Sequence, residues 1–117
     1  MVKYSGAVSA SSLDNVFDAL ANDKRRGIVH TLSFRPATVS QLANEHDLSL
    51  AAIHKHIRSL ETAKLIQRRK VGRVNFVALD SKGLSVLQSW AMQYRTEWGN
   101  NKETLENYIA SLEHNRT

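Results

Sequence analysis

The sequence predicts one mainly helical domain with a single small β-hairpin, in the order ααααββα. Three observations lead to this fold class. Several segments repeat apolar residues with helical spacing, two short helices meet at a tight turn, and a glycine lies between two runs that favour strands. The 117 residues are enough for one domain but not for two. Only 42% of them are apolar, which suggests that a second copy completes part of the core.

The first two helices are expected from apolar spacing and from their caps. From Leu13 onward the apolar residues recur at i, i+3, i+4 and i+7, and Ser12 is a suitable N-cap. The next helix should begin near Asp23, which is also a good cap. The residues before Ser12 are small and polar, so we expect a flexible N-terminus over 1–11 and a folded domain over 12–117.

Two short helices joined by a tight turn should follow. Thr38 and Gln41 have the spacing of a capping box, in which each side chain bonds the backbone N–H of the other residue. Asp47 is suited to the left-handed conformation that the turn needs, and Ser49 should cap the second helix. The expected buried residues of that helix are Leu50, Ile53, Ile57 and Leu60. This arrangement is a helix-turn-helix.

The opposite face of this second helix combines small residues near its start with basic residues farther along. Its members are Ala51, Ala52, His54, Lys55, Arg58 and Glu61. Such a helix can enter the major groove of DNA without clashes and still donate hydrogen bonds. We expect His54, Lys55 and Arg58 to contact bases or nearby phosphates. Ser49 should bind a phosphate with its hydroxyl and the helix N-terminus.

A β-hairpin should come directly after this helix. Residues 65–70 and 74–79 are rich in strand formers, and a glycine-containing turn, 71–73, separates them. The basic residues of this hairpin are Arg68, Arg69, Lys70 and Arg73. A hairpin in this position is a wing, placed to bind the DNA backbone or to reach the minor groove. The alternative is a charged tip that only keeps the hairpin soluble.

The positive charge of the chain is concentrated in these two elements. Residues 49–73 hold seven lysines and arginines but one acidic residue, whereas the whole chain has a net charge of +5. A basic segment of this kind is typical of proteins that bind a polyanion, and a solvated face without a partner is the alternative. The basic run 24–26 either binds a phosphate or pairs with Asp18 or Asp23.

The C-terminal part should be helical again, with a dimerisation helix over about 81–113. The segment 99–101 marks either a break in this helix or a weak spot. A first apolar stripe comprises Leu84, Leu87, Ala91, Tyr94 and Trp98, with Trp90 beside it. A second stripe comprises Leu105, Tyr108, Ile109 and Leu112. Because aromatic stripes usually bury area, we favour core and dimer packing for the first stripe over a ligand pocket.

Several classes of function are excluded by residues that the chain lacks. It has no cysteine, which rules out thiolate metal sites and disulfides. Neither a catalytic constellation nor a glycine-rich phosphate loop occurs, so we expect neither an enzyme nor a cofactor. No apolar run approaches the roughly 18 residues of a membrane span. The N-terminus also lacks an apolar signal core, so a cytoplasmic location is expected.

An ordered set of motifs resembles the ArsR family of bacterial and archaeal repressors. The set is VFDALANDKRRGIV (16–29), VSQLA (39–43), LSLAAIHKHIRSL (48–60), AKLI (63–66) and GR (72–73). The resemblance extends over most of the chain, from about Val16 to Trp98. It implies a winged-helix homodimer whose first and last helices form the interface.

The resemblance also implies roles for individual residues. The residues expected at or beside DNA are Ser49, Ala51, Ala52, His54, Lys55, His56 and Arg58 on the second helix, and Arg68, Arg69, Lys70 and Arg73 on the wing. The residues expected in the dimer interface are Leu13, Val16, Phe17, Leu87, Trp90, Tyr94 and Trp98. We expect His56 to be partly buried and structural. It lies two residues from His54, about 200° around a helix, so the two cannot chelate one ion from the same face.

The chain departs from the family pattern at three positions. His54 stands where a serine is usual, which should alter sequence preference, and Asp47 and Lys64 stand where glycines are usual. Many members sense metals through a cysteine motif or through Asp and His pairs on the last helix. This chain offers only Glu113 and His114 there, so it resembles the members without a metal site. The sequence therefore indicates neither a metal nor a small-molecule effector.

These observations predict a sequence-specific regulator of transcription that binds double-stranded DNA, and more narrowly a repressor. Two-fold symmetry of a homodimer would require an inverted repeat with half-sites about one helical turn apart. Three alternatives remain: a sensor with a ligand-switched equilibrium, an architectural protein that coats DNA without sequence preference, and a protein-interaction module with an acidic partner.

Overall fold

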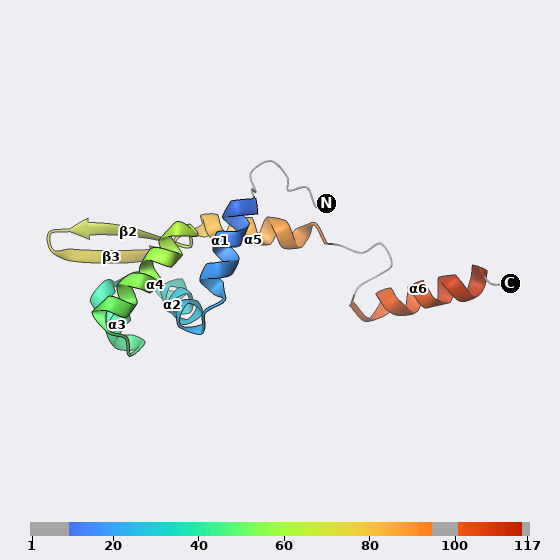
Figure 1. Cartoon of the computed structure of the whole chain (residues 1–117), viewed down its shortest axis with the longest axis horizontal. Coiled ribbons are helices and arrows are strands. Elements are labelled where there is room, and N and C mark those ends of the chain that lie inside the picture. The colour runs from blue at the N-terminus through green and yellow to red at the C-terminus, as the bar shows by residue number, and fades with distance from the viewer. Residues whose placement is uncertain (1–9, 95–100, 116–117) are drawn as a thin grey trace.

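The structure, a computed structural model, describes residues 10–94 and 101–115. The elements are α1 (Ala10–Leu20), α2 (Asp23–Phe34), β1 (Ala37–Thr38), α3 (Val39–Glu45), α4 (Leu50–Thr62), β2 (Ile66–Val71), β3 (Val74–Leu79), α5 (Ser81–Met92) and α6 (Asn101–Asn115), and all but the short β1 are labelled in Figure 1. The β2–β3 hairpin projects from one end of the body formed by α1–α5, and α6 lies apart from that body (Figure 1). The predicted mainly helical winged helix-turn-helix is confirmed.

The hydrophobic core lies between the helices of the body and the base of the hairpin. Its largest fully buried side chains are Ile28, Leu42, Ile53, Ile57, Leu60, Leu65, Val16 and Val77. Each is worth about 1.5–3 kcal/mol in apolar burial. The prediction that Leu50 belongs to the buried face of α4 is wrong, because this side chain is 60% exposed. Leu50 is the first residue of α4 and faces a surface hollow instead of the core.

The sheet has three antiparallel strands in the order β1-β3-β2. In the β2–β3 hairpin Val71 faces Val74 across a two-residue turn, and Gly72 has a φ of 62°. Positive φ at the first turn residue alone is the pattern of a type II′ turn, which matches the twist of the strands. Strand β1 was not predicted from the sequence. It has two residues, with Ala37 opposite Val77, and so short a strand has no periodic pattern.

The predicted cap of α3 is confirmed, whereas those of α1 and α2 are wrong. The capping box forms, with Thr38 Oγ1 accepting from Gln41 N at 3.1 Å and Gln41 Oε1 accepting from Thr38 N at 2.9 Å. The N-cap of α2 is Asn22, whose Oδ1 accepts from Arg25 N at 3.1 Å. An Asn and an Asp cap about equally well, so the sequence did not distinguish these neighbours. Helix α1 begins at Ala10, so Ser12 lies inside its first turn.

Both helices of the helix-turn-helix end in a Schellman motif. After α3, Leu48 N donates to Ala43 O at 2.8 Å, and Asp47 has a φ of 52°. After α4, Leu65 N donates to Leu60 O at 3.0 Å, and Lys64 has a φ of 56°. These 6→1 bonds satisfy carbonyls that would otherwise lack a partner at the helix ends. The left-handed conformation expected for Asp47 is confirmed.

The range 81–113, expected as one dimerisation helix, contains all of α5 and most of α6. Helix α5 ends at Met92, where Gln93 N and Tyr94 N bond carbonyls three residues back at 3.2 Å and tighten the last turn. Tyr94 therefore lies just past the helix. Trp98 and Gly99 lie outside the described residues, as do residues 1–9 of the expected flexible N-terminus.

Candidate nucleic-acid interface

Helix α4 presents an outer face that is small at its start and basic farther along. Ile53, Ile57 and Leu60 fix the helix on the core, which turns Lys55 and Arg58 to the outside. Ala51, Lys55 and Arg58 are exposed, whereas Ala52, His54 and His56 are half-buried. Ser49 is exposed, and its Oγ accepts from Ala52 N at 3.1 Å, which confirms the predicted cap. Its hydroxyl hydrogen can still be donated to an acceptor outside the helix.

A hollow runs along each flank of α4. The wing-side hollow, of about 440 Å³, is lined by Thr38, Val39, Ser40, Leu50, His54, Arg73, Val74 and Asn75. The α1-side hollow, of about 570 Å³, is lined by Asn15, Asp18, Ala19, Arg25, Lys55, His56, Arg58, Ser59 and Thr62. The structure thus brings His54 together with the wing residue Arg73, and Lys55 together with Arg58. The outer face of α4 is a ridge between two depressions that carry cations.

The basic run that opens α2 binds backbone carbonyls in preference to carboxylates. Arg25 Nε donates to Ala19 O at 2.7 Å, and its Nη2 donates to Asp18 O at 3.0 Å. Arg26 Nη1 donates to Leu20 O at 2.8 Å. These are the last carbonyls of α1, where cations also interact favourably with the helix dipole. The salt bridge to Asp18 or Asp23 that the sequence offered is not formed among the described residues, and the phosphate contact stays a prediction.

His56 is held by Arg25 on the floor of the α1-side hollow. Arg25 Nη1 lies 3.3 Å from His56 Nδ1, and an arginine can only donate, so Nδ1 accepts and the proton of the neutral ring sits on Nε2. Burial lowers the pKa of His56 below its usual value, and the positive charge of Arg25 lowers it further. The ring is therefore neutral at pH 7, with an Nε2–H that can donate to a ligand.

The wing divides its basic residues by the direction in which they point. Directly opposed residues of an antiparallel pair share one face of the sheet. Arg68 faces the buried Val77, and its Nη2 lies 3.0 Å from Glu61 Oε1 of α4. Arg69 pairs instead with Phe76 on the other face, and both side chains are exposed. Arg68 therefore joins the wing to α4, which offsets much of its charge.

Within the described residues, five cations of this surface have no carboxylate within salt-bridge distance. They are Lys55, Arg58, Arg69, Lys70 and Arg73. All five are exposed. Their positive charge is available to an anionic partner. The predicted DNA-facing residues thus gather along α4 and the wing, and Arg68 differs from the others by its ion pair. Leu50 is a lining residue that the sequence placed in the core, although its position at the start of the helix was a usable signal.

A cluster of aromatic side chains, the aromatic patch, joins α1 to α5. Phe17 and Trp90 meet edge to face with ring centres 5.2 Å apart, and Trp90 lies 5.1 Å from Tyr94. Phe17 is 39% and Tyr94 52% exposed. Leu87 is half-buried, as is Trp90. The other interface residues expected on α1, Leu13 and Val16, are buried by the chain itself.

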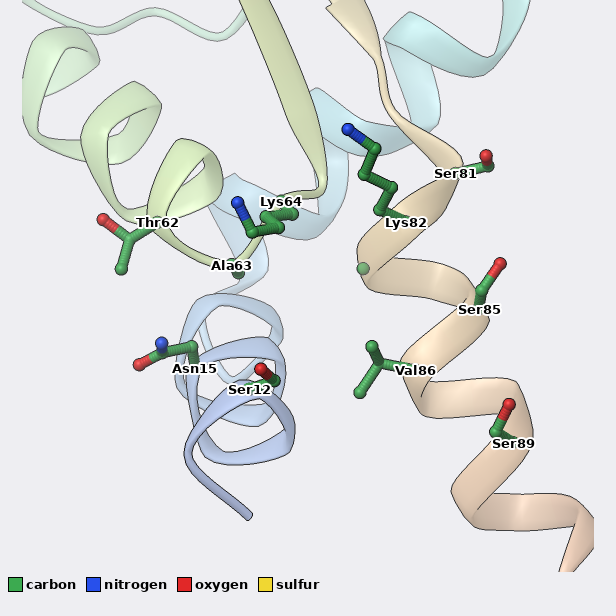
Figure 2. A pocket seen from close by; sticks show the side chains of 11 residues that line it. Ser12, Asn15, Thr62, Ala63, Lys64, Ser81, Lys82, Ser85, Val86 and Ser89 are labelled. Carbon is green, nitrogen blue, oxygen red and sulfur yellow. The ribbon is translucent and has the colours of Figure 1, made fainter. Parts of the chain in front are cut away.

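A further cavity of about 480 Å³ lies between α1, the end of α4 and the start of α5. Ser12, Asn15, Lys64 and Lys82 are among its lining residues. Ligand sites usually have a few polar groups that converge on one point. In Figure 2 the hydroxyl oxygens of the α5 serines point to the side of α5 away from α1, so the lining does not converge. Among the residues described, no group of three His, Asp or Glu side chains could hold a metal ion.

Comparison with known proteins relates this chain to a family of regulators. A family profile described as a helix-turn-helix domain matches residues 20–69. The HTH-type transcriptional regulator Rv2034 of Mycobacterium tuberculosis is 36% identical over 78 residues, which are 67% of this chain and 73% of that protein. The crystal structure of an ArsR family transcriptional regulator has 34% identity and a TM-score of 0.69, and 80% of this chain and 91% of the other are covered. The chain belongs to the ArsR family of winged helix-turn-helix transcriptional regulators.

As an ArsR-family member the chain is a DNA-binding transcriptional regulator and not an enzyme. Transcriptional repressor SdpR of Bacillus subtilis is 24% identical over 82 residues, 70% of this chain and 91% of that protein. The homodimeric winged helix-turn-helix DNA-binding domain Mb0332 of Mycobacterium bovis has 22% identity and a TM-score of 0.58, with 71% of this chain and 75% of the other covered. None of the described helices combines the length and apolar character required to cross a membrane.

Proposed function

We propose that this ArsR-family regulator binds an inverted repeat in double-stranded DNA as a homodimer and represses transcription there. The observation that carries the proposal is the ridge of α4 between two hollows that carry cations. An α-helix fits the major groove, about 12 Å wide, and the phosphate backbones then lie along both flanks of the helix. Lys55 and Arg58 are on one flank and Arg73 is on the other.

The residues of this surface divide into base contacts and phosphate contacts. His54 and Lys55 are our candidates for base edges or the phosphates next to them, because they lie on the outer half of α4 near its start. Ser49 donates its hydroxyl to a phosphate while its oxygen caps α4. His56 orients the Arg25 side chain and offers its Nε2–H to a phosphate of the DNA backbone. The small side chains of Ala51 and Ala52 allow close approach.

The wing supplies affinity that does not depend on base sequence. Arg69, Lys70 and Arg73 release counterions when they lie on phosphates, so affinity should fall steeply with salt. Arg68 contributes less, because Glu61 already pairs with it.

A homodimer would cover the apolar surface that a single chain leaves exposed. The aromatic patch of Phe17, Trp90 and Tyr94 lies on α1 and α5. Helix α6 adds a stripe of exposed apolar side chains, namely Leu105, Tyr108, Ile109 and Leu112. The homodimeric state of the similar domain Mb0332 supports this assembly. Leu13 and Val16 support α1 from within the chain, so we place the partner contacts on the patch and the stripe.

Repression is the direction that the similar repressor SdpR supports. A dimer that covers two successive major grooves would exclude other proteins from the same promoter DNA. We expect a reporter gene behind the bound site to be expressed less when the protein is present. Higher expression would contradict repression but not DNA binding.

The test is the affinity of the purified protein for duplexes selected from random sequence, compared with scrambled duplex at about 0.15 M salt. We expect a preference of about a thousandfold or more for an inverted repeat. Uniform, cooperative binding to both duplexes would indicate an architectural protein, and no binding to either would contradict the proposal.

Two variants separate the assigned roles. Arg73→Ala should weaken binding to selected and scrambled duplex alike and lower the salt slope by about 1. Lys55→Ala should weaken binding to the selected duplex more, by about 1–3 kcal/mol. Lys82→Ala is the matched control, because Lys82 is an exposed lysine that lines neither hollow of α4. The assigned roles would be contradicted if Lys55→Ala, like Arg73→Ala, weakened binding to the selected and the scrambled duplex by the same amount.

A further inference from the structure

Leu50 is an exposed apolar side chain on the surface proposed to face DNA. It is 60% exposed, whereas Ile53 and Ile57 of the same helix are fully buried. It lines the wing-side hollow together with His54 and Arg73. The side chain neither completes the core nor offers a hydrogen bond to a phosphate. A role in packing within the chain therefore does not explain it.

We infer that Leu50 recognises thymine, by packing against the C5-methyl group in the major groove, and so fixes one base pair of each half-site. The inference rests on the proposed function, because it requires α4 to lie in the major groove. The thymine methyl is the apolar group among the base edges there, and the other positions are hydrogen-bond donors and acceptors. A leucine side chain can discriminate between bases through that group alone.

The structure holds Leu50 where a base edge would be reached first. It is the first residue of α4, and residues near the N-terminus of a recognition helix contact the bases. The Ser49 cap fixes that end of the helix, since Ser49 Oγ accepts from Ala52 N at 3.1 Å. Little conformational freedom of the backbone is then lost on binding.

His54 shares this face of α4 and would contact a second base. The two residues are four apart, so they lie on one face and about 6 Å apart along the helix axis. Successive bases are separated by about 3.4 Å along a strand. The geometry therefore places the thymine contacted by Leu50 about two base-pair steps from the base contacted by His54.

The test removes one methyl group from the DNA. Each thymine of the selected duplex is replaced in turn by deoxyuridine, which pairs identically but lacks the C5-methyl. At one thymine per half-site we expect the wild-type protein to lose affinity about three- to fivefold, the value of one buried methyl group. Leu50→Ala should bind the thymine and deoxyuridine duplexes equally well at that position. Because Leu50 is exposed, the variant should keep the fold, which circular dichroism would show.

Val74→Ala is the matched control, since Val74 is another exposed apolar residue that lines the same hollow from the wing. This variant should still distinguish thymine from deoxyuridine. The inference is overturned if the wild-type protein binds equally well when deoxyuridine replaces any of the thymines. It is also overturned if this replacement lowers the affinity of Leu50→Ala as much as it lowers the affinity of the wild-type protein. Failure to select any preferred duplex would overturn the proposed function itself, which is a different result.

Discussion

At the scale of single residues, two side chains occupy a backbone conformation that favours glycine. Asp47 ends α3 with a φ of 52°, and Lys64 ends α4 with a φ of 56°. In this region the Cβ atom crowds the following carbonyl oxygen, which costs about 1–2 kcal/mol. An Asp offsets part of this cost by local hydrogen bonding, whereas a Lys has no comparable means. Lys64 is thus the more strained position.

Lys64→Gly should therefore stabilise the protein. We expect the free energy of unfolding in urea to rise by about 0.5–1 kcal/mol, which is the relief of strain less the greater freedom of glycine in the unfolded chain. Lys64→Ala is the control, because it removes the long side chain but keeps the Cβ atom. An equal gain from both variants would show that the side chain, and not the backbone, is responsible.

A second residue-scale feature is the His56 ring bound to Arg25. Burial and the Arg25 charge lower the pKa of His56 in the folded chain. The unfolded chain, with a histidine pKa of about 6.5, therefore binds more protons below that pH. The contribution of the neutral His56 ring to the free energy of unfolding should be complete above about pH 6.5. This contribution should be lost as the pH decreases below that value.

This dependence can be tested with His56→Gln, which can still accept a hydrogen bond from Arg25. Urea titrations at pH 7.5 and 5.5 should show a larger loss of stability for the wild-type protein than for the variant. If both proteins lose the same amount, the protonation of His56 contributes nothing to acid destabilisation.

At the scale of elements, the start of α5 is packed closely against the turn between α4 and β2. Gly83 N donates to Lys64 O at 2.8 Å. A Cβ atom at position 83 would lie 2.5 Å from Ala63 O and 2.9 Å from Lys64 O. Both neighbours are backbone atoms, so the helix itself would have to move. This contact fixes the start of α5, which carries part of the proposed dimer interface, against the end of α4, the helix proposed to read DNA.

Gly83→Ala should accordingly destabilise the protein by about 1–3 kcal/mol, the usual range for overpacking. The measurement is the midpoint of urea unfolding at a fixed protein concentration. Ser85→Ala on the exposed side of the same helix serves as the control and should change stability by less than about 0.5 kcal/mol. A Gly83→Ala midpoint within the range of this control would mean that α5 can shift at little cost.

At the scale of the whole molecule, the proposed dimer depends on apolar surface that one chain leaves uncovered. Trp90 is central to the aromatic patch because it contacts both Phe17 and Tyr94. Trp90→Asp places a charge where the proposed interface would exclude water, so it should convert the dimer to a monomer. Sedimentation would report the mass of the protein in solution. Affinity for the inverted repeat should fall because two separate protomers no longer bind the two half-sites as one unit.

Phe34→Asp is the control for this variant. Phe34 is a more exposed aromatic residue, at the end of α2 and outside the patch. The Phe34→Asp substitution should leave both the mass in solution and the affinity for the inverted repeat unchanged. A Trp90→Asp protein that stays dimeric would move the interface away from the patch, and α6 would then be the next surface to test.

The sequence by itself determined the features that depend on local spacing. The periodic apolar residues of α3 and α4 predicted two helices, and Thr38, Gln41 and Ser49 predicted their caps, because a cap bonds a backbone group only three residues away. The hairpin followed from strand formers around Gly72. The concentration of positive charge in residues 49–73 predicted where a polyanion would bind.

Only the tertiary structure decided which of these residues remain available. Periodicity placed Leu50 with Ile53 in the core, yet the first turn of α4 faces the wing-side hollow. Composition treated Arg68 and Arg73 alike, yet strand register turns Arg68 toward Glu61, whereas Arg73 in the turn has no carboxylate within salt-bridge distance among the described residues. Such outcomes depend on contacts between elements far apart in the chain, and the spacing of residues along one element carries no information about them.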